Sequence, residues 1–236
     1  MTNPNRKLLL IGGGGHCRSV LDCALSLDLY NDIGIVSKER DAVLGIPFVG
    51  SDQDLSTLFQ NGWTDAFITV GSIGNTAVRR RLYEMIRQIG FNLPSIVDNT
   101  AIVARGTQIS EGCFVGKKAV INTGASLGCC SIINTGAIVE HDCAVGDFCH
   151  ISPGAVLCGQ VRIGHDTHIG AGTVIRQQIT IGNNVMIGAG SIVLSNIPDN
   201  VVLFGTISKS TICKTAWGGK PVIDCFADLF HAERAA

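Results

Sequence analysis

Residues 133–163 read INTGAIVEHDCAVGDFCHISPGAVLCGQVRI and lie within the stretch that decides the fold, residues 97–193. Throughout this stretch an aliphatic residue returns at every sixth position, without a gap. These positions are Val97, Val103, Ile109, Val115, Ile121, Leu127, Ile133, Val139, Val145, Ile151, Leu157, Ile163, Ile169, Ile175, Ile181, Ile187 and Val193. The residue four positions after each of them is nearly always small or β-branched. Such a hexapeptide period predicts a parallel β-helix, whose repeats bury their apolar side chains only by stacking on one another.

Both series of side chains are expected to point into the β-helix. If three hexapeptides make one coil, the stretch forms roughly five and a half coils. With a strand spacing of about 4.8 Å, the β-helix is then on the order of 25 Å tall.

Composition narrows the class of partner. The formal net charge is −1 and basic blocks are absent, which argues against binding to nucleic acid or to an anionic membrane. No apolar run approaches the roughly 18 residues that cross a bilayer, so we expect no membrane insertion. The run Leu8–Ile11 stops at four glycines and is too short for a signal peptide, so we expect a cytoplasmic protein.

The ten cysteines form no CxxC pair that would indicate a metal site or a redox motif. Cys113, Cys143 and Cys149 occupy the small inward position of the repeat. We interpret them as compact apolar fillers of the core.

The chain opens with a pattern typical of a nucleotide-binding βαβ unit. A short apolar run, Lys7–Ile11, meets Gly12, Gly13, Gly14 and Gly15, and His16 precedes a segment with helical periodicity, residues 17–27. Backbone amides at such a helix N-terminus bind phosphate. Cys17 stands where a dinucleotide motif has its third glycine, so the loop indicates phosphate better than NAD. A tight turn without any ligand remains an alternative.

Two further strands are predicted at Ile33–Ser37 and Ala66–Val70, and a helix at residues 76–89. Alternation of strands and helices indicates a small parallel sheet, whose ligand crevice lies at the carboxyl ends of the strands. The turn Gly71–Asn75 would meet the glycine loop there. Arg79, the arginine nearest to this turn, is a candidate for ligand contact, although an arginine on a helix is more often solvated.

Two histidines lie outside the inward positions. His141 and His150 are nine residues apart, half a coil, so they should project from opposite sides of one subunit. They would share a site only if neighbouring subunits pack side by side. Asp142 follows His141, and a carboxylate beside an imidazole suits a general base. A solvated turn is the alternative for this pair.

A zinc site is a further alternative. His150 and His168 are 18 residues apart and would stack on one face, with His165 close by, as in a trimeric β-helical carbonic anhydrase. Zinc needs three convergent ligands and a second shell. His141 and His165 fall on different faces of one chain, so we expect no metal.

Several short motifs together carry a resemblance to a known family. They are Leu10–His16, Gly45–Gly50, Val70–Asn75 with Arg79, Ile138–Cys143, and His150–Ala155 with Gly159. Up to about Lys209 the chain resembles the bacterial left-handed β-helix acyltransferases that modify sugars. Within them it is most similar to the sialic-acid O-acetyltransferase-like family, which includes nucleotide-sugar N-acetyltransferases.

The resemblance implies a homotrimer with acetyl-CoA lying between adjacent β-helices. His141 matches the general base and Asp142 its carboxylate partner. His150 matches a residue that contacts the acetyl carbonyl or the thioester region, and the Gly159 amide matches a contact to the same oxygen. Further acetyl-CoA contacts are predicted at Ile169, Gly170, Ile187, Gly188 and Lys209.

The resemblance also implies an acceptor pocket in the N-terminal domain. Its predicted residues are Gly12, Gly13, Gly14, Gly15, His16, Ser37, Lys38, Gly71, Ser72, Gly74, Asn75 and Arg79. Relatives that bind nucleotides usually carry acidic residues suited to uridine after the second strand. This chain has Ser37-Lys38-Glu39 there, which favours a UDP-sugar acceptor less. The family's GxPAK segment reads Gly205–Lys209 here and lacks its proline, so a loop near CoA should differ.

The sequence therefore predicts an α/β N-terminal Rossmann-like domain followed by an all-β left-handed parallel β-helix of hexapeptide repeats. The predicted units are residues 1–94 for the acceptor, 95–209 for acyl-CoA and catalysis, and a tail at 210–236. The predicted activity is transfer of an acetyl group from acetyl-CoA, a co-substrate, to an amino or hydroxyl group of a sugar or sugar nucleotide. A non-catalytic sugar-nucleotide-binding scaffold is the alternative from another class.

Overall fold

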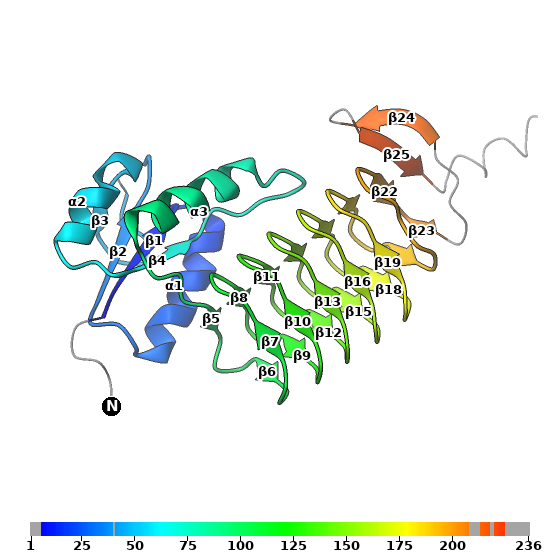
Figure 1. The fold of residues 1–236 in the computed structure, drawn as a ribbon, viewed down its shortest axis with the longest axis horizontal. Helices are drawn as coiled ribbons and strands as arrows, with labels where there is room; N and C mark the ends of the chain where they lie inside the picture. The colour runs from blue at the N-terminus through cyan, green and yellow to red at the C-terminus, as the bar shows by residue number, and fades with distance from the viewer. Residues whose placement is uncertain (1–5, 40, 208–212, 218–219, 225–236) are drawn as a thin grey trace, which may run out of the picture.

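A small α/β unit stands at one end of a long coil of short strands (Figure 1). The structure is a computed structural model that describes residues 6–39, 41–207, 213–217 and 220–224. The last helix of the α/β unit ends at Ile89 and the first short strand begins at Ile96. The predicted boundary at residue 94 falls in this connection.

The α/β unit is a four-stranded parallel sheet in the order β3-β2-β1-β4. Its strands are β1 (Lys7–Ile11), β2 (Asp32–Val36), β3 (Phe48–Gly50) and β4 (Asp65–Ile68). Its helices are α1 (Gly15–Leu27), the 3-10 turn η1 (Asp52–Asp54), α2 (Leu55–Gln60) and α3 (Ala77–Ile89). Alternate residues of β1 point to opposite faces, so Leu8 and Leu10 pack with α1, whereas Leu9 and Ile11 pack with α2 and α3.

The predicted elements of this unit are present with shifted ends. The predicted strand Ile33–Ser37 is β2 and begins one residue earlier, and the predicted strand Ala66–Val70 is β4 and ends at Ile68. The prediction missed β3 and α2. β3 has only three residues and α2 only six, too few to show a clear period.

The β-helix consists of three sheets built from two-residue strands that pair in parallel, with partners 18 residues apart in the coils. The nine-stranded sheet begins with β5 (Ile96–Val97), β8 (Phe114–Val115), β11 (Ile132–Ile133), β14 (His150–Ile151), β17 (His168–Ile169) and β20 (Met186–Ile187). The seven-stranded sheet begins with β6 (Ile102–Val103), β9 (Val120–Ile121), β12 (Ile138–Val139), β15 (Val156–Leu157), β18 (Val174–Ile175) and β21 (Ile192–Val193). The five-stranded sheet holds β7 (Gln108–Ile109), β10 (Ser126–Leu127), β13 (Ala144–Val145), β16 (Arg162–Ile163) and β19 (Thr180–Ile181).

Every predicted aliphatic position from Val97 to Val193 is the second residue of one of these strands. Most of these side chains form one core together with the small residues, including Cys113, Cys143 and Cys149 as predicted. The first coil differs, because no coil lies beneath it. Val97 and Ile109 are only partly buried and Val103 is 38% exposed, so the prediction that every aliphatic position lies in the core was wrong there.

The coil continues beyond the period. β22 (Val202–Phe204) pairs with β20, and β23 (Thr206–Ile207) pairs with β21. β25 (Lys220–Asp224) extends the nine-stranded sheet and pairs antiparallel with β24 (Cys213–Trp217). From its sequence the stretch 223–230 could form a closing helix, but residues 223 and 224 belong to β25, and the remaining residues lie outside the described ones.

The α/β unit sits on the first coils of the nine-stranded sheet. Ile96, Phe114 and Ile132 of this sheet share a core with α1. Leu93, Cys130 and Phe148 share a second core with α2 and α3. Two apolar clusters therefore join the α/β unit to the β-helix. Each cluster contains side chains from both units.

Candidate active site

His141 and Asp142 lie in the turn that leads from the seven-stranded to the five-stranded sheet, a corner that we call the His141 corner (residues 140–143, 158–161, 176–179 and 194–197). His141 Nδ1 is 2.9 Å from Asp142 Oδ2. Because a carboxylate only accepts, Nδ1 is the donor of this bond, and in the neutral imidazole Nε2 is then left as an acceptor. The side chains are 51% and 57% exposed, so this dyad faces outward and is open to a substrate.

Two glycines on neighbouring coils leave room for the dyad. A Cβ on Gly159, one coil above, would overlap the imidazole of His141 at Nε2. A Cβ on Gly124, one coil below, would overlap the carboxylate of Asp142. Gly159 and His141 are therefore direct neighbours within a single chain.

A glutamate that the sequence analysis did not single out supports this turn. Glu140 Oε2 accepts from Asn122 Nδ2 at 3.0 Å and from the His141 backbone amide at 3.3 Å. Asp142 itself adopts a left-handed conformation with φ of 59°. Side-chain and backbone constraints thus fix both residues of the dyad on a rigid coil.

A hollow of about 250 Å³ lies beside His141 and is lined by Gly159, Gln160, Gln177 and Gln178 as well. A neighbouring hollow of about 340 Å³ contains Asp142 and Arg162. Gln178 Nε2 donates to Gln160 Oε1 at 2.9 Å, so the glutamines form a ladder along the corner. Glutamine side chains thus line the surface next to the dyad.

His150 lies on a different face, as predicted from its half-coil separation. Its Nδ1 is 3.1 Å from the carbonyl oxygen of Ser72, and its Nε2 is 3.1 Å from Asn134 Nδ2. The carbonyl fixes the proton on Nδ1, so Nε2 accepts from the amide. Burial lowers the pKa of His150, and the charge of Arg79 lowers it further. Both ring nitrogens are engaged within the chain, and the proposed contact with an acetyl group stays a prediction.

The glycine loop lines a pocket of about 450 Å³ in the α/β unit. The predicted residues Gly12–Gly15, His16, Ser37, Lys38 and Gly71 all line it. The first turn of α1 has no acidic residue, and its N-cap residue, Gly14, makes no side-chain cap. Its amides therefore favour an anion, and Lys38 adds a positive charge.

Three charged residues that line this pocket were not predicted from the sequence to contact ligand. They are Glu39, Asp52 and Arg81. Arg81 pairs with Asp52 at 3.1 Å, and both lie on elements, α3 and η1, whose approach depends on tertiary packing. Glu39 follows β2 closely in the sequence, but no local pattern indicated that its side chain faces the pocket.

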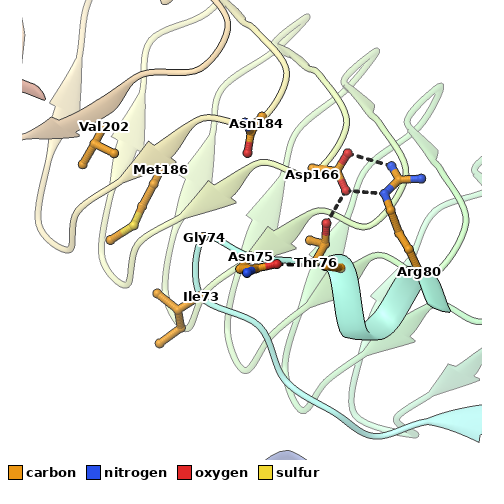
Figure 2. Close-up of a pocket in the computed structure, with 10 residues that line it drawn as sticks. Ile73, Gly74, Asn75, Thr76, Arg80, Asp166, Asn184, Met186 and Val202 are labelled. Atoms are coloured by element: carbon orange, nitrogen blue, oxygen red, sulfur yellow. Dashed lines mark hydrogen bonds and ion pairs between the residues drawn. The ribbon is translucent and has the colours of Figure 1, made fainter. Parts of the chain in front are cut away.

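A second cavity, of about 720 Å³, lies between the segment after β4 and the β-helix (Figure 2). Gly74 and Asn75, which were predicted to join the glycine loop, line this cavity. Its other lining residues are Ile73, Thr76, Ala77, Arg80, Asp166, Asn184, Met186 and Val202. The predicted acceptor residues are thus divided between two cavities, with Ser72 placed over His150 instead.

Arg79 lines neither of these two cavities, and its predicted contact with ligand stays a prediction. It is 2% exposed and donates from Nη2 to the carbonyl oxygen of Cys130 in the β-helix. Its guanidinium lies over the ring of Phe148, 5.8 Å from the centroid. On α3 the buried residues are Arg79, Leu82 and Ile86, so helical periodicity turns Arg79 inward and Arg80 outward.

The predicted acetyl-CoA contacts are not gathered around His141 within one chain. Ile169 and Ile187 are fully buried in the core, which leaves only their backbone atoms for a ligand. Gly170 and Gly188 follow β17 and β20 at the corner between the nine- and seven-stranded sheets, a different corner from that of His141. Lys209 lies outside the described residues.

Among the described residues, no group of three or more His, Cys, Asp or Glu side chains is arranged to hold a metal ion. The described helices include none that is both long and apolar enough to span a bilayer.

Fold and site together define a hexapeptide-repeat transferase with an α/β domain at its N-terminus. Residues 7–86 match the PglD N-terminal domain family, and residues 160–203 match the bacterial transferase hexapeptide (six repeats) family. The acetyltransferase domain of PglB from Neisseria gonorrhoeae FA1090 is 38% identical, with 85% of this chain and 97% of that chain covered and a TM-score of 0.81. It has also been solved in complex with acetyl coenzyme A.

PerB from Caulobacter crescentus, solved in complex with CoA and GDP-perosamine, is 34% identical, with 84% of this chain and 94% of that chain covered and a TM-score of 0.80. WeeI from Acinetobacter baumannii AYE, 20% identical with a TM-score of 0.75, shares the fold. The chain belongs to the hexapeptide-repeat sugar acetyltransferases that carry a PglD-type N-terminal domain. The predicted fold class, including the left-handed β-helix, is confirmed.

Proposed function

We propose that this protein transfers an acetyl group from acetyl-CoA to an amino or hydroxyl group of a nucleotide-linked sugar, with His141 as general base. The observation that carries the proposal is the outward-facing His141–Asp142 dyad beneath Gly159. The PglB domain was solved with acetyl coenzyme A, and PerB with CoA and GDP-perosamine, which supports these two substrate classes. A perosamine N-acetyltransferase from Caulobacter crescentus was also solved in complex with CoA and GDP-perosamine after a histidine had been changed to asparagine or alanine.

In the proposed reaction the acceptor attacks the thioester carbonyl while His141 Nε2 takes its proton. The new C–N or C–O bond forms, the C–S bond breaks, and the CoA thiolate recovers a proton from the imidazolium. Asp142 holds Nδ1–H throughout and stabilises the imidazolium. A positioned base contributes roughly 10²–10⁴-fold.

The Gly159 amide is suited to the oxyanion of this reaction. Within the part of the chain that the structure describes, its N–H makes no hydrogen bond. An unpaired donor on a rigid coil costs little to reorganise when charge develops, and one such donor is worth about 10²–10³-fold in kcat. The hollow beside His141 and Gly159 would receive the thioester.

A homotrimer is part of the proposal, because one chain does not bring His141 and His150 together. The outward residues of the seven-stranded sheet form a continuous aliphatic stripe, namely Ile102, Val120, Ile138, Val156, Val174 and Ile192. Ile102 is 64% exposed and Ile192 43%. Apolar stripes of this length are buried in interfaces, and this one borders the His141 corner, so a neighbouring subunit would complete the site.

The acceptor is assigned to the α/β unit. An uncapped helix N-terminus and Lys38 suit a diphosphate, and the 450 Å³ pocket has the size of a small-molecule site. A cytoplasmic location is proposed as well, and the eight cysteines within residues 6–207, which are free thiols, agree with a reducing compartment.

The test is release of CoA thiol from acetyl-CoA with a panel of amino-sugar nucleotides and free sialic acids. His141→Ala should lose most turnover and still bind acetyl-CoA in calorimetry. His165→Asn is the matched control, because His165 is an equally exposed histidine beside an aspartate, Asp147, at another corner. Turnover of His141→Ala at the wild-type rate would contradict the assignment of His141 as general base. Nucleotide binding by the wild type without any thiol release would indicate a non-catalytic scaffold.

A further inference from the structure

The segment between β4 and α3, residues 71–76, is a wall of both cavities. Gly71 lines the glycine-loop pocket, and Ile73 to Thr76 line the larger cavity. The same segment covers the nine-stranded sheet, where the Ser72 carbonyl accepts from His150. A Cβ on Gly74 would come within 3.1 Å of Met186 Sδ, so the backbone lies directly on the sheet.

One carboxylate of the β-helix holds the end of this segment. Asp166 accepts from Thr76 Oγ1 at 2.5 Å and from Arg80 Nε and Nη2, each at 2.7 Å (Figure 2). All three donors come from the α/β unit, and the arginine contact is bidentate, the stronger geometry for such a pair. The guanidinium of Arg80 also lies 4.4 Å from the centroid of Phe148, which fixes it from a second side.

Thr76 is used in an unusual way. It is the N-cap residue of α3, yet its hydroxyl makes no cap and donates to Asp166 instead. The side chain of Asn75 takes over, and its Oδ1 accepts from the Ala77 amide at 2.9 Å. The start of α3 is therefore built to contact the β-helix at the expense of the ordinary threonine cap.

Arg79 adds a buried contact at the same turn. Its Nη2 donates to the Cys130 carbonyl, while Nε and Nη1 have no partner among the described residues. Burying a guanidinium with unpaired donors is unfavourable, and removal of such a group is often neutral or stabilising. Its presence here agrees with a role in fixing geometry.

We propose that Asp166, Thr76 and Arg80, with Arg79 beneath them, form a clamp that keeps segment 71–76 ordered as the preformed wall of the acceptor site. Asp166 and Arg80 are then positioning residues. The inference rests on the proposed function, since it assigns the segment to the acceptor. A free segment would have to be ordered by the acceptor itself, so loss of the clamp raises the acceptor KM and leaves the acetyl-CoA KM unchanged.

The experiment compares Asp166→Asn and Arg80→Met with the wild type. Each should raise the acceptor KM about five- to twentyfold, with kcat changed less than threefold, as expected for loss of a charged hydrogen bond at a partly exposed site. The charge swap Arg80→Asp with Asp166→Arg should recover part of the lost affinity. Thr76→Val, which removes one bond only, should show a smaller rise and serves if the larger changes impair folding.

Arg87→Met is the matched control. Arg87 also joins α3 to the β-helix, through Glu111 at 3.2 Å, but it lies at the other end of the helix. It should leave the acceptor KM unchanged. An equal rise in Arg87→Met would show that the clamp has no special role and that docking of the domain is what matters.

Amide hydrogen exchange provides a readout that does not need turnover. In Asp166→Asn, residues 71–76 should exchange faster, whereas residues of β1 and α1 should not. If the wild type acetylates no acceptor, the proposed function fails, yet the exchange result still decides whether the clamp orders the segment. Unchanged exchange together with an unchanged acceptor KM would overturn the inference.

Discussion

Gly159 lies one coil above His141, and the imidazole occupies the space that a side chain at residue 159 would fill. This relationship exists because the coils stack with an 18-residue offset, which places residue 159 directly over residue 141. Its backbone does not need glycine, since its φ is not in the left-handed region. The absence of a side chain at this position is therefore a requirement of the imidazole and of any group that binds beside it.

Gly159→Ala tests this requirement. The added methyl group should displace His141 from its position and lower kcat roughly 10²-fold, because small misplacement of a catalytic group is costly. Folding should be little affected, since the position faces outward. Steady-state kinetics and thermal unfolding measure the two effects separately. A folded variant with the wild-type kcat would show that the close approach of Gly159 has no catalytic importance.

Asp142→Asn isolates the charge of the carboxylate. Asp142 has a φ of 59°, a conformation that asparagine also tolerates, whereas alanine would add strain. The amide keeps a similar shape but no longer stabilises an imidazolium. We expect kcat to fall by about 10-fold to 10³-fold, less than in His141→Ala, with acetyl-CoA binding retained. A kcat equal to that of the wild type would make Asp142 a structural residue of the turn.

Three histidines, of which His168 is buried and His16 and His150 are partly buried, predict how stability depends on pH. Burial lowers the pKa of His16 to about 3 and that of His168 to about 4, and it also lowers the pKa of His150. In the unfolded chain a histidine titrates near 6.5, so below that pH the unfolded state binds more protons. The free energy of unfolding should therefore fall from about pH 6.5 toward pH 4, by up to about 1.4 kcal/mol per pH unit for each histidine.

His168→Asn provides the comparison. Above pH 7 its difference in stability from the wild type should be constant, and below pH 6.5 the difference should change in favour of the variant. Asp166 does not disturb this window: its bonds to Arg80 and Thr76 outweigh burial and lower its pKa, so its contribution is lost only at more acidic pH. Denaturant titrations at pH 5 and pH 8 measure the effect. Equal differences at both values would contradict it.

The β-helix was predictable from sequence because each coil repeats the same local requirement. The aliphatic period marked the residue that ends each strand of the coils, and the half-coil spacing of His141 and His150 predicted that they lie on different faces. The exposed Val103 was mispredicted because the first coil has the period but no neighbour beneath it. The period describes a repeat and contains no information about its ends.

The junction of the two units was the part that sequence did not predict. Arg79, Arg80 and Arg81 are consecutive, and local sequence does not tell which one turns inward, because that depends on where the β-helix approaches α3. Asp166 is 86 residues from Arg80 and follows no visible motif. The one available signal was the helical spacing of Arg79, Leu82 and Ile86, which marks a buried face and would have predicted that Arg79 is buried.

The aliphatic stripe of the seven-stranded sheet predicts how the subunits assemble. Val174→Glu should place a charge within the proposed interface, so the variant should remain folded but lose the trimer, which sedimentation measures. Thr180→Glu is the control, since Thr180 is the outward residue of β19 in the five-stranded sheet, one corner away. Turnover should be lost with the trimer in Val174→Glu and kept in Thr180→Glu. A fully active monomeric Val174→Glu would mean that one chain contains the whole site, and a monomeric wild type would mean that the stripe binds another partner.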